Sequence, residues 1–204
     1  MIELQFLQLY ADEGVYKQYT YGNTATYIVV YVDDLLLFCN NLSHLQDIKQ
    51  QLSDTFTMTD MGEVTSYLSI RIRRDRRRKC IYLDQTQYIE DMLKKFGIEN
   101  CAPIGTPMDV NVRLSKEMCP QTQDEVEEMA NIPYQSAVGS LMYLMLATRP
   151  DITYAIGVVS KFNSNYGRQH WQAIKRIFHY LQYTKEYCLN YGPKDTFVRY
   201  SDAD

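Results

Sequence analysis

The chain has 204 residues and a formal net charge of −4, which allows one large or two small domains with a substantial core. No apolar run approaches the ~20 residues that cross a bilayer, and residues 1–6 lack the basic start of a secretory signal, so we expect neither a membrane protein nor a secreted one. The five cysteines have no metal-ligand spacing, which favours reduced thiols in an intracellular protein.

The negative charge is unevenly distributed along the chain. One acidic cluster consists of Asp124, Glu125, Glu127 and Glu128, and the remainder of the chain is neutral. Local patches govern phosphate binding more than net charge does. The overall charge therefore does not exclude a nucleic-acid partner.

The first forty residues predict a short helix followed by a β-hairpin. Residues 2–10 carry apolar side chains that suit a short helix. The run Tyr27–Val32 is β-branched and aromatic, and Leu35–Cys39 is short and apolar, so each suits a strand. The two acids between them, Asp33 and Asp34, would then lie at the tip of a tight hairpin.

Two charges in such an apolar stretch need an explanation. A carboxylate between buried strands must be paired, hydrogen-bonded or bound to a metal. Oxygen ligands on a rigid turn suit Mg²⁺ (or Mn²⁺). The alternative is that Asp33 and Asp34 only form the turn, since Asp favours turns. Two-residue hairpins usually carry Gly, which is absent here, so the pattern favours the metal site.

A helix and a second hairpin are expected next. Ser43 can cap a helix whose apolar side chains have helical spacing; these are Leu45, Ile48, Leu52 and Phe56. Val64–Ile72 predicts a strand, Arg73–Lys79 the tip of a hairpin, and Cys80–Leu83 the returning strand.

The clearest helix begins near residue 86. Asp84 or Thr86 can cap it, and Gly97 ends it. One face is apolar, formed by Tyr88, Ile89, Met92, Leu93 and Phe96. The following segment, 101–133, contains four of the six prolines and the acidic cluster, and predicts a linker.

Three helices and a pair of strands are expected after the linker. The first, from Pro133 to Ala147, is apolar nearly all round and should be buried. The second presents Ile152, Ile156, Val159 and Phe162 on one face, and the third, Arg168–Lys185, presents Trp171, Ile174, Phe178 and Leu181. His170 and His179 lack metal partners at ligand spacing and are interpreted as structural. The strands are Cys188–Tyr191 and Phe197–Ala203.

Tyr31-Val-Asp-Asp34 resembles the active-site hairpin of reverse transcriptases of Ty1/copia-type retrotransposons. Further matches follow in family order: Phe56–Gly62, Tyr67–Ile70, Leu83–Ile89, Thr106–Met108, Val138–Tyr143, Thr148–Ile152, His170–Arg176 and Tyr200–Asp204. Because they cover nearly the whole chain, it is identified as a member of this family.

The resemblance implies an α+β fold with four parts. Residues 1–100 would form part of a reverse-transcriptase palm sheet and a thumb-like segment. Residues 101–133 would be the linker, residues 134–186 a helical connection region, and residues 187–204 the opening strands of a ribonuclease H-like domain.

The resemblance also implies RNA-directed DNA polymerase activity within a Pol polyprotein. The partners would be an RNA template, a DNA primer and deoxynucleoside triphosphates, and the cofactor Mg²⁺ or Mn²⁺. Asp33 and Asp34 would be two of three carboxylates that bind a metal pair. The family places the third on an upstream strand, and Asp202 matches the first carboxylate of an incomplete ribonuclease H metal site. We therefore expect a fragment that does not polymerise alone.

Three groups of residues would contact the primer or the nucleic acid by the same resemblance. Tyr31 would contact the primer end, its alternative role being a strand aromatic in the core. The hairpin that grips the primer terminus would be Tyr67, Leu68 and Ser69, with Ser69 where the family usually has Gly. A basic run could bind phosphates or form a solvated hairpin tip; it comprises Arg73, Arg74, Arg76, Arg77, Arg78 and Lys79.

An alternative function is a non-catalytic transposon remnant, or a domesticated nucleic-acid-binding protein. It is favoured by the missing third carboxylate, by the Ser at position 69 and by the basic run. Either function implies an intracellular location, in the cytoplasm (in a virus-like particle) or in the nucleus.

Overall fold

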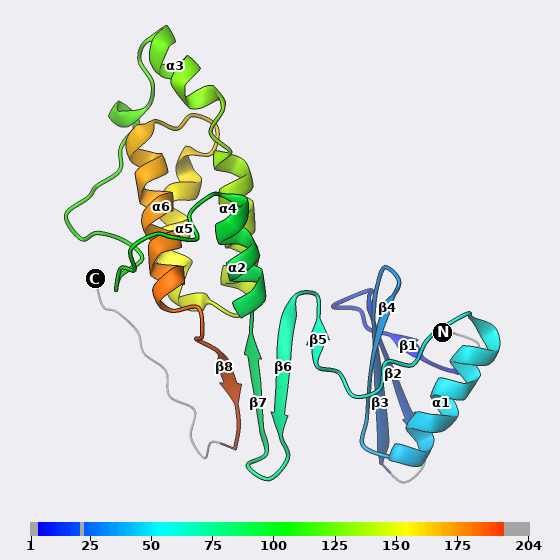
Figure 1. Ribbon diagram of the computed structural model, residues 1–204. Helices are drawn as coiled ribbons and strands as arrows, with labels where there is room; N and C mark the ends of the chain where they lie inside the picture. The colour runs from blue at the N-terminus through cyan, green and yellow to red at the C-terminus, as the bar shows by residue number, and fades with distance from the viewer. Residues whose placement is uncertain (1–3, 21–22, 194–204) are drawn as a thin grey trace, which may run out of the picture. The chain divides into compact units, whose positions relative to one another are not determined.

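A computed structural model describes residues 4–20 and 23–193 of the chain (Figure 1). The chain forms two compact units, Met1–Val64 and Thr65–Asp204. Both contain helices and strands, which confirms the α+β class at this level. The segment 1–100 that the sequence predicts as palm and thumb spans parts of both units.

The first unit is an antiparallel sheet with one helix packed against it. Its strands lie in chain order, β1 (Leu7–Gln8), β2 (Val15–Thr20), β3 (Thr24–Tyr31) and β4 (Asp34–Cys39), and are followed by α1 (Leu42–Thr55). The core consists of Phe6 and Ile28 with Ile48 and Leu52 of α1. Both strands of the predicted hairpin are therefore confirmed.

Two local predictions for this unit are wrong. Residues 2–10 were expected to form a helix, but Leu7 and Gln8 pair with β2 as an edge strand. A helix of nine residues without a cap is marginal in water, and pairing with β2 gives the backbone its hydrogen bonds instead. The N-cap of α1 is Asn41 and not Ser43, because the Asn41 side chain accepts from the His44 amide at 3.1 Å.

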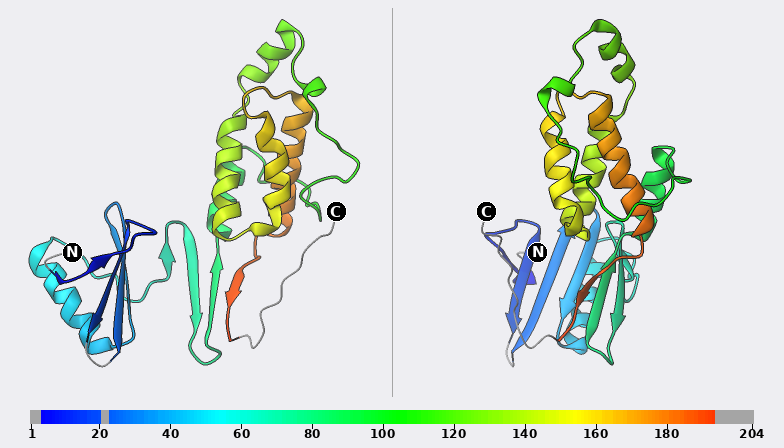
Figure 2. Two further views of the ribbon diagram at one scale, coloured as in Figure 1. Left: turned by 180° about the vertical axis from the view of Figure 1, so that it is seen from behind. Right: turned by 90° about the vertical axis from the view of Figure 1, so that its left-hand side faces the viewer.

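The second unit combines a four-stranded antiparallel sheet with a bundle of helices beyond one end of the strands (Figures 1 and 2). The strands, in sheet order, are β5 (Ser66–Tyr67), β6 (Ile70–Asp75), β7 (Cys80–Asp84) and β8 (Leu189–Tyr191). The helices are α2 (Thr86–Lys95), α3 (Gln123–Ala130), α4 (Tyr134–Ala147), α5 (Thr153–Val159) and α6 (Arg168–Tyr183). Short 3₁₀ turns cover Lys116–Met118, Pro150–Ile152 and Ser160–Phe162.

The helices of the second unit share one hydrophobic core. The buried side chains come from α2, α4, α5 and α6, and the largest of them include Tyr134, Phe178, Leu141 and Ile174. The predicted burial of the 133–147 helix all round is wrong, since Met142 is 41% exposed and Leu146 is 77% exposed. One face of α4 fills the core and the other remains at the surface.

The strand predicted at Val64–Ile72 is divided by a turn. Leu68 and Ser69 both have positive φ, 48° and 60°, and Tyr67 pairs with Ile70 across them. Positive φ at both central residues is typical of a two-residue hairpin turn. The residue pattern alone predicts an unbroken strand here, because neither position is a glycine, whereas the family resemblance predicts the hairpin. The next hairpin also differs from the prediction. Its tip was expected at Arg73–Lys79, but strand β6 continues to Asp75.

The predicted linker 101–133 is partly ordered against the helices. It contains α3, which has a capping box formed by Thr122 and Glu125. Its first part lies along α6, where the Ile104 amide donates to the His179 carbonyl at 3.3 Å. The strand expected at Cys188–Tyr191 is confirmed as β8, and it pairs with β7. The strand expected at Phe197–Ala203, and Asp202 with it, lie outside the described residues.

Candidate functional site

The two acids of the Tyr31–Asp34 motif lie at the exposed tip of the β3–β4 hairpin. Tyr31 pairs with Asp34, so Val32 and Asp33 form a two-residue turn. Val32 has a φ of +52° and is 82% exposed. A positive φ is unusual for a β-branched residue, and such backbone strain gathers at functional sites. The turn therefore brings the two acids side by side at the hairpin tip without a glycine.

The environment of these acids differs from the sequence-based expectation. Asp33 and Asp34 are both exposed, so burial does not force either carboxylate to find a partner. Asp33 lies in the turn, and Asp34 is the first residue of β4, at the end of the apolar run. The part of the chain that the structure describes contains no group of three or more His, Cys, Asp or Glu arranged to hold a metal ion. Asp33 and Asp34 are thus two oxygen donors that do not form a closed metal site by themselves.

Tyr31 lies at the end of β3, beside the acids. It is 54% exposed, so it is not a buried core aromatic. Its ring is accessible to a ligand at the tip of the hairpin.

The β5–β6 hairpin of the second unit contains the predicted primer-grip residues. Tyr67 and Ile70 pair across the turn formed by Leu68 and Ser69. The hydroxyl of Tyr143, on α4, donates to the Leu68 carbonyl. This anchor was missed from the sequence, because Tyr143 lies 75 positions away in a helix that was predicted only as buried.

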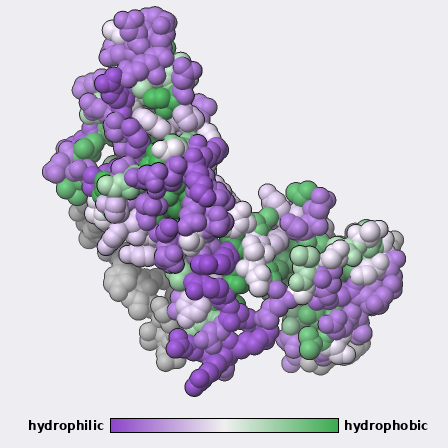
Figure 3. Space-filling view, viewed as in Figure 1, coloured by the Kyte–Doolittle hydropathy of each residue, from purple (hydrophilic) through white to green (hydrophobic). Residues whose placement is uncertain are grey.

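The basic run extends along β6 and around the turn to β7. Arg73 and Arg74 lie on β6, and the residues of the turn and its neighbours are Arg76, Arg77, Arg78 and Lys79. Asp75 organises the turn, since its Oδ1 accepts from the Arg78 amide at 2.9 Å. The lower end of this hairpin is strongly hydrophilic (Figure 3).

Arg71 was not singled out from the sequence, but it belongs to this surface. Its Nε lies 3.0 Å from Oδ1 and 3.1 Å from Oδ2 of Asp84, which is fully buried at the end of β7. Burial alone would raise the pKa of Asp84, but hydrogen bonds from Arg71 and Thr86 outweigh it and keep the pKa below its usual range. Asp84 is therefore a buried carboxylate held in its charged form.

A cavity of about 400 Å³ lies between the 104–112 segment and α6. Its lining combines apolar side chains, such as Met108, with the basic side chains of Lys175 and Arg176. Asp109 pairs with Arg176 at 3.4 Å. The cavity contains none of the residues predicted to contact the primer or the metal.

Comparison with known proteins places the chain in a family. Residues 1–110 match the family model of reverse transcriptase (RNA-dependent DNA polymerase). The chain therefore belongs to the reverse transcriptase family. No solved structure matches it significantly.

The similar curated proteins are mainly transposon products. The chain is 42% identical over 200 residues to the retrovirus-related Pol polyprotein from transposon TNT 1-94 of Nicotiana tabacum, covering 98% of this chain and 15% of that protein. It is 35% identical over 185 residues to the Pol polyprotein from transposon RE1 of Arabidopsis thaliana, covering 90% and 12%. A transposon Ty5-1 protein of Saccharomyces cerevisiae is 29% identical over 203 residues, covering 98% and 63%. The chain thus spans less than a sixth of the length of these two Pol polyproteins.

These relatives confirm the predicted similarity to the Pol polyproteins of retrotransposons. Within the described residues, no helix is both long and apolar enough to cross a bilayer.

Proposed function

We propose that the chain is part of an RNA-directed DNA polymerase of a Ty1/copia-type Pol polyprotein. The observation that carries the proposal is the exposed tip of the β3–β4 hairpin, where a two-residue turn presents Asp33 beside Asp34. A strained Val32 fixes that turn. Two adjacent carboxylates on a tight turn suit a site for divalent metal ions.

In this proposal Asp33 and Asp34 contribute two of the carboxylates that hold Mg²⁺ or Mn²⁺. The bound ions would activate the primer hydroxyl and stabilise the triphosphate leaving group. The third carboxylate comes from another segment of a longer Pol chain, because no further acid completes a three-residue metal group within the described residues. Asp202 would begin a separate ribonuclease H site in the same polyprotein.

The proposed substrates are an RNA template, a DNA primer and deoxynucleoside triphosphates. Tyr31 is placed beside the acids, with 54% of its surface exposed, where it can contact the primer end. The turn at Leu68 and Ser69 contributes the primer grip, and its anchor on Tyr143 limits its movement. The basic hairpin contributes phosphate contacts.

Primer extension tests this function. A longer Pol chain that contains residues 1–204 should extend a DNA primer on an RNA template in Mg²⁺, and Asp33→Asn should abolish the extension. Asp54→Asn is a matched control, because Asp54 is an exposed acid of α1 in the same unit and contacts only Gln50 in the described part of the chain. Equal extension by the Asp33→Asn variant would contradict the metal role.

A second candidate function is nucleic-acid binding without catalysis. The basic hairpin favours this function, because it belongs to the second unit whereas Asp33 belongs to the first. In that case, the 204-residue chain should bind RNA or DNA with an affinity that falls steeply as salt rises. Neutralising Arg77 and Arg78 with Gln should weaken the binding, whereas Asp33→Asn should leave it unchanged. Binding that does not depend on salt would exclude this function.

A further inference from the structure

The buried carboxylate of Asp84 holds two arginines that remain half exposed. Arg71 reaches both carboxylate oxygens through Nε, and Nη2 of Arg73 lies 3.3 Å from Oδ2. The Asp84 side chain is 0% exposed, whereas those of Arg71 and Arg73 are 50% and 51% exposed. The carboxylate is thus inside the unit and both guanidinium groups extend from it to the surface.

The two guanidinium groups lie on one face of the sheet. Arg71 and Arg73 are two residues apart on β6, so their side chains point the same way. The register places Asp84 opposite Arg71, and Tyr82 opposite Arg73. The guanidinium carbon of Arg73 lies 5.6 Å from the centre of the Tyr82 ring. Each arginine therefore has its position fixed before any ligand arrives.

The charges on this face do not cancel. One arginine is enough to neutralise Asp84, and the second leaves a net positive charge. Asp75, the acid of β6 itself, is engaged with Arg78. Within the residues that the structure describes, Asp84 is the one acid that pairs with Arg71 or Arg73. The remaining N–H groups of both guanidinium groups are available to an anion.

We propose that Arg71 and Arg73 form a phosphate-binding pair for the backbone of a nucleic-acid strand, with Asp84 as the positioning residue. The proposal rests on the proposed nucleic-acid function and names a geometry for it. Guanidinium groups match phosphate oxygens in a two-pronged arrangement, and contacts to the backbone position a strand without reading its sequence. The phosphates engaged would be consecutive ones of a single strand.

The spacing and the surrounding charge favour a strand over a single phosphate. Side chains two apart on β6 repeat about every 6.6 Å, which is comparable to the separation of successive phosphates along a strand. The positive charge continues past this pair to the turn, through Arg76, Arg77, Arg78 and Lys79. A strand that follows the hairpin would pass these residues in order, and of these Arg78 is already paired with Asp75.

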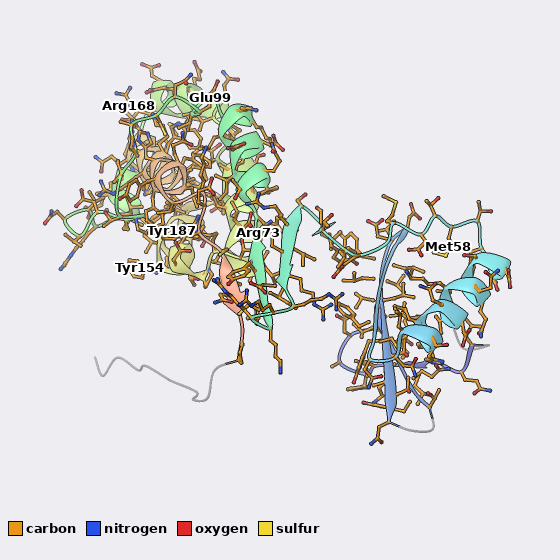
Figure 4. The ribbon with its side chains drawn as sticks, turned by 60° about the horizontal axis from the view of Figure 1, so that its bottom comes forward. Met58, Arg73, Glu99, Tyr154, Arg168 and Tyr187 are labelled. Atoms are coloured by element: carbon orange, nitrogen blue, oxygen red, sulfur yellow. The ribbon has the colours of Figure 1, made fainter. Side chains whose placement is uncertain are left out.

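A charge-conserving variant tests whether geometry matters. Arg71→Lys combined with Arg73→Lys keeps both charges but loses the fixed fork of donors. Anisotropy of a labelled single-stranded oligonucleotide of mixed sequence should show at least a fivefold rise in Kd. Arg168→Lys is the matched control, because Arg168 is an exposed arginine with one acid partner, Glu128, and lies in a different part of the same unit (Figure 4). It should bind as the unchanged chain does.

Asp84→Asn separates positioning from simple charge. The substitution adds one positive charge to the protein, so electrostatics alone would tighten binding. A positioning role predicts weaker binding instead, with unchanged emission of Trp171 as the check on folding. The effect should also disappear in the background that already carries both lysines, since the two changes act on one arrangement. Tighter binding by Asp84→Asn would overturn the positioning role.

The other possible results distinguish failure of the phosphate pair from failure of the proposed function. If the double lysine variant binds like the unchanged chain, while Arg77→Gln with Arg78→Gln weakens binding, the phosphate pair is wrong and the proposed function stands. If the unchanged chain does not bind the oligonucleotide at low salt, the phosphate pair and the second candidate function both fail, whereas primer extension by the longer Pol chain tests the polymerase separately. Inorganic triphosphate should not displace the oligonucleotide at comparable phosphate concentration, and displacement would assign the pair to a free phosphate ligand and overturn the proposal. If Asp84→Asn does not fold, the double lysine variant decides.

Discussion

Arg149 donates two hydrogen bonds to the carboxylate of Asp151, from Nε to Oδ1 at 3.0 Å and from Nη2 to Oδ2 at 2.7 Å. Only 1% of Arg149 is exposed. Its Nη1 also donates to the Thr184 carbonyl at 3.1 Å, and its Nη2 to the Thr184 hydroxyl at 2.6 Å. One buried guanidinium therefore joins the corner after α4 to the end of α6.

Replacing this arginine should destabilise the second unit strongly. Arg149→Met leaves the Asp151 carboxylate without its counter-charge, and removing one partner of a buried pair costs roughly 3–5 kcal/mol. Because Asp151 is one-third exposed, at 33%, we expect a loss of about 3 kcal/mol, at the lower end of that range. Urea unfolding followed by the fluorescence of Trp171, the single tryptophan of the chain, measures the loss.

A surface ion pair of the same unit provides the control. Arg168 pairs with Glu128 at 2.6 Å, but its side chain is 71% exposed. Exposed ion pairs contribute at most about 1 kcal/mol to stability, so Arg168→Met should change the unfolding free energy by less than about 1 kcal/mol. Equal losses from the two variants would mean that burial does not determine the effect.

Replacing two glycines of the second unit with alanine should change its stability in opposite directions. A Cβ on Gly167 would lie 2.0 Å from the Met118 carbonyl oxygen, which is backbone and cannot rotate away. Adding a methylene-sized group to a well-packed site typically costs roughly 1–3 kcal/mol. Gly167→Ala should therefore lower the unfolding free energy of the unit by about that amount or more. Gly157 lies inside α5, and apart from its chain neighbours and the backbone of its own helix no atom lies within 4 Å of its Cβ position.

Gly157→Ala should stabilise α5 by roughly 0.5–1 kcal/mol, because alanine loses less backbone entropy in a helix. Thermal unfolding of both variants under the same conditions checks the two signs. A higher melting temperature for Gly167→Ala would contradict the close approach to Met118.

The sequence predicted those elements whose signals are local. The β3–β4 hairpin followed from β-branched runs on either side of Asp33 and Asp34. The end of α2 followed from Gly97, which has a φ of +66°. In both cases the residues that determine the structure lie within a few positions of one another, so periodicity and turn chemistry suffice.

The sequence did not predict the contacts that join distant segments. Asp84 or Thr86 was predicted to cap α2, but the N-cap is Gln85. Asp84 does accept from the Thr86 amide at 3.3 Å, but its strongest partner is Arg71, thirteen positions away. The turn at Leu68 and Ser69 followed only from the family resemblance and not from the residue pattern, because its positive φ values are stabilised by pairing and by Tyr143 rather than by glycine. Such choices depend on tertiary contacts, which override local preference.

The strained turn at Val32 predicts a gain in stability for the first unit on substitution. Asn adopts positive φ more readily than a β-branched residue does, and the left-handed region costs roughly 1–2 kcal/mol per ordinary residue. Val32→Asn should therefore raise the opening free energy of the β3 and β4 amides by up to about 1 kcal/mol. Their hydrogen exchange should slow accordingly. Tyr19→Asn, at an exposed strand position that pairs with Ala25, should not slow it. Faster exchange in Val32→Asn would contradict the strain.

Burial of His170 predicts that stability falls in mildly acidic solution. Its ring is fully buried, stacks on Phe162 with 4.0 Å between centroids, and accepts from the Gly167 amide through Nδ1 at 2.9 Å. The Nε2–H then donates to the Ser115 carbonyl at 3.2 Å. Burial lowers the pKa of His170, although the Ser115 carbonyl partly offsets this.

The lowered pKa of His170 determines the direction in which stability changes with pH. Above about pH 6.5, the ordinary value for an unfolded histidine, both states are neutral and the stabilisation is complete. As the pH falls below that value, the unfolded chain takes up a proton that the folded chain resists, so the unfolding free energy decreases until the folded pKa is reached. Asp84 and Asp151, whose pKa values are also lowered, act only below about pH 4.

The measurement compares urea unfolding at pH 7.5 and pH 5.5 by Trp171 fluorescence. The unchanged chain should be less stable at pH 5.5, and His170→Asn should lose most of that difference, because Asn has no proton to take up in this range. His179→Asn is the control, since His179 lies on the surface of α6 with its Nδ1 2.7 Å from the Ala102 carbonyl oxygen. An unchanged pH dependence in His170→Asn would assign the decrease to another group.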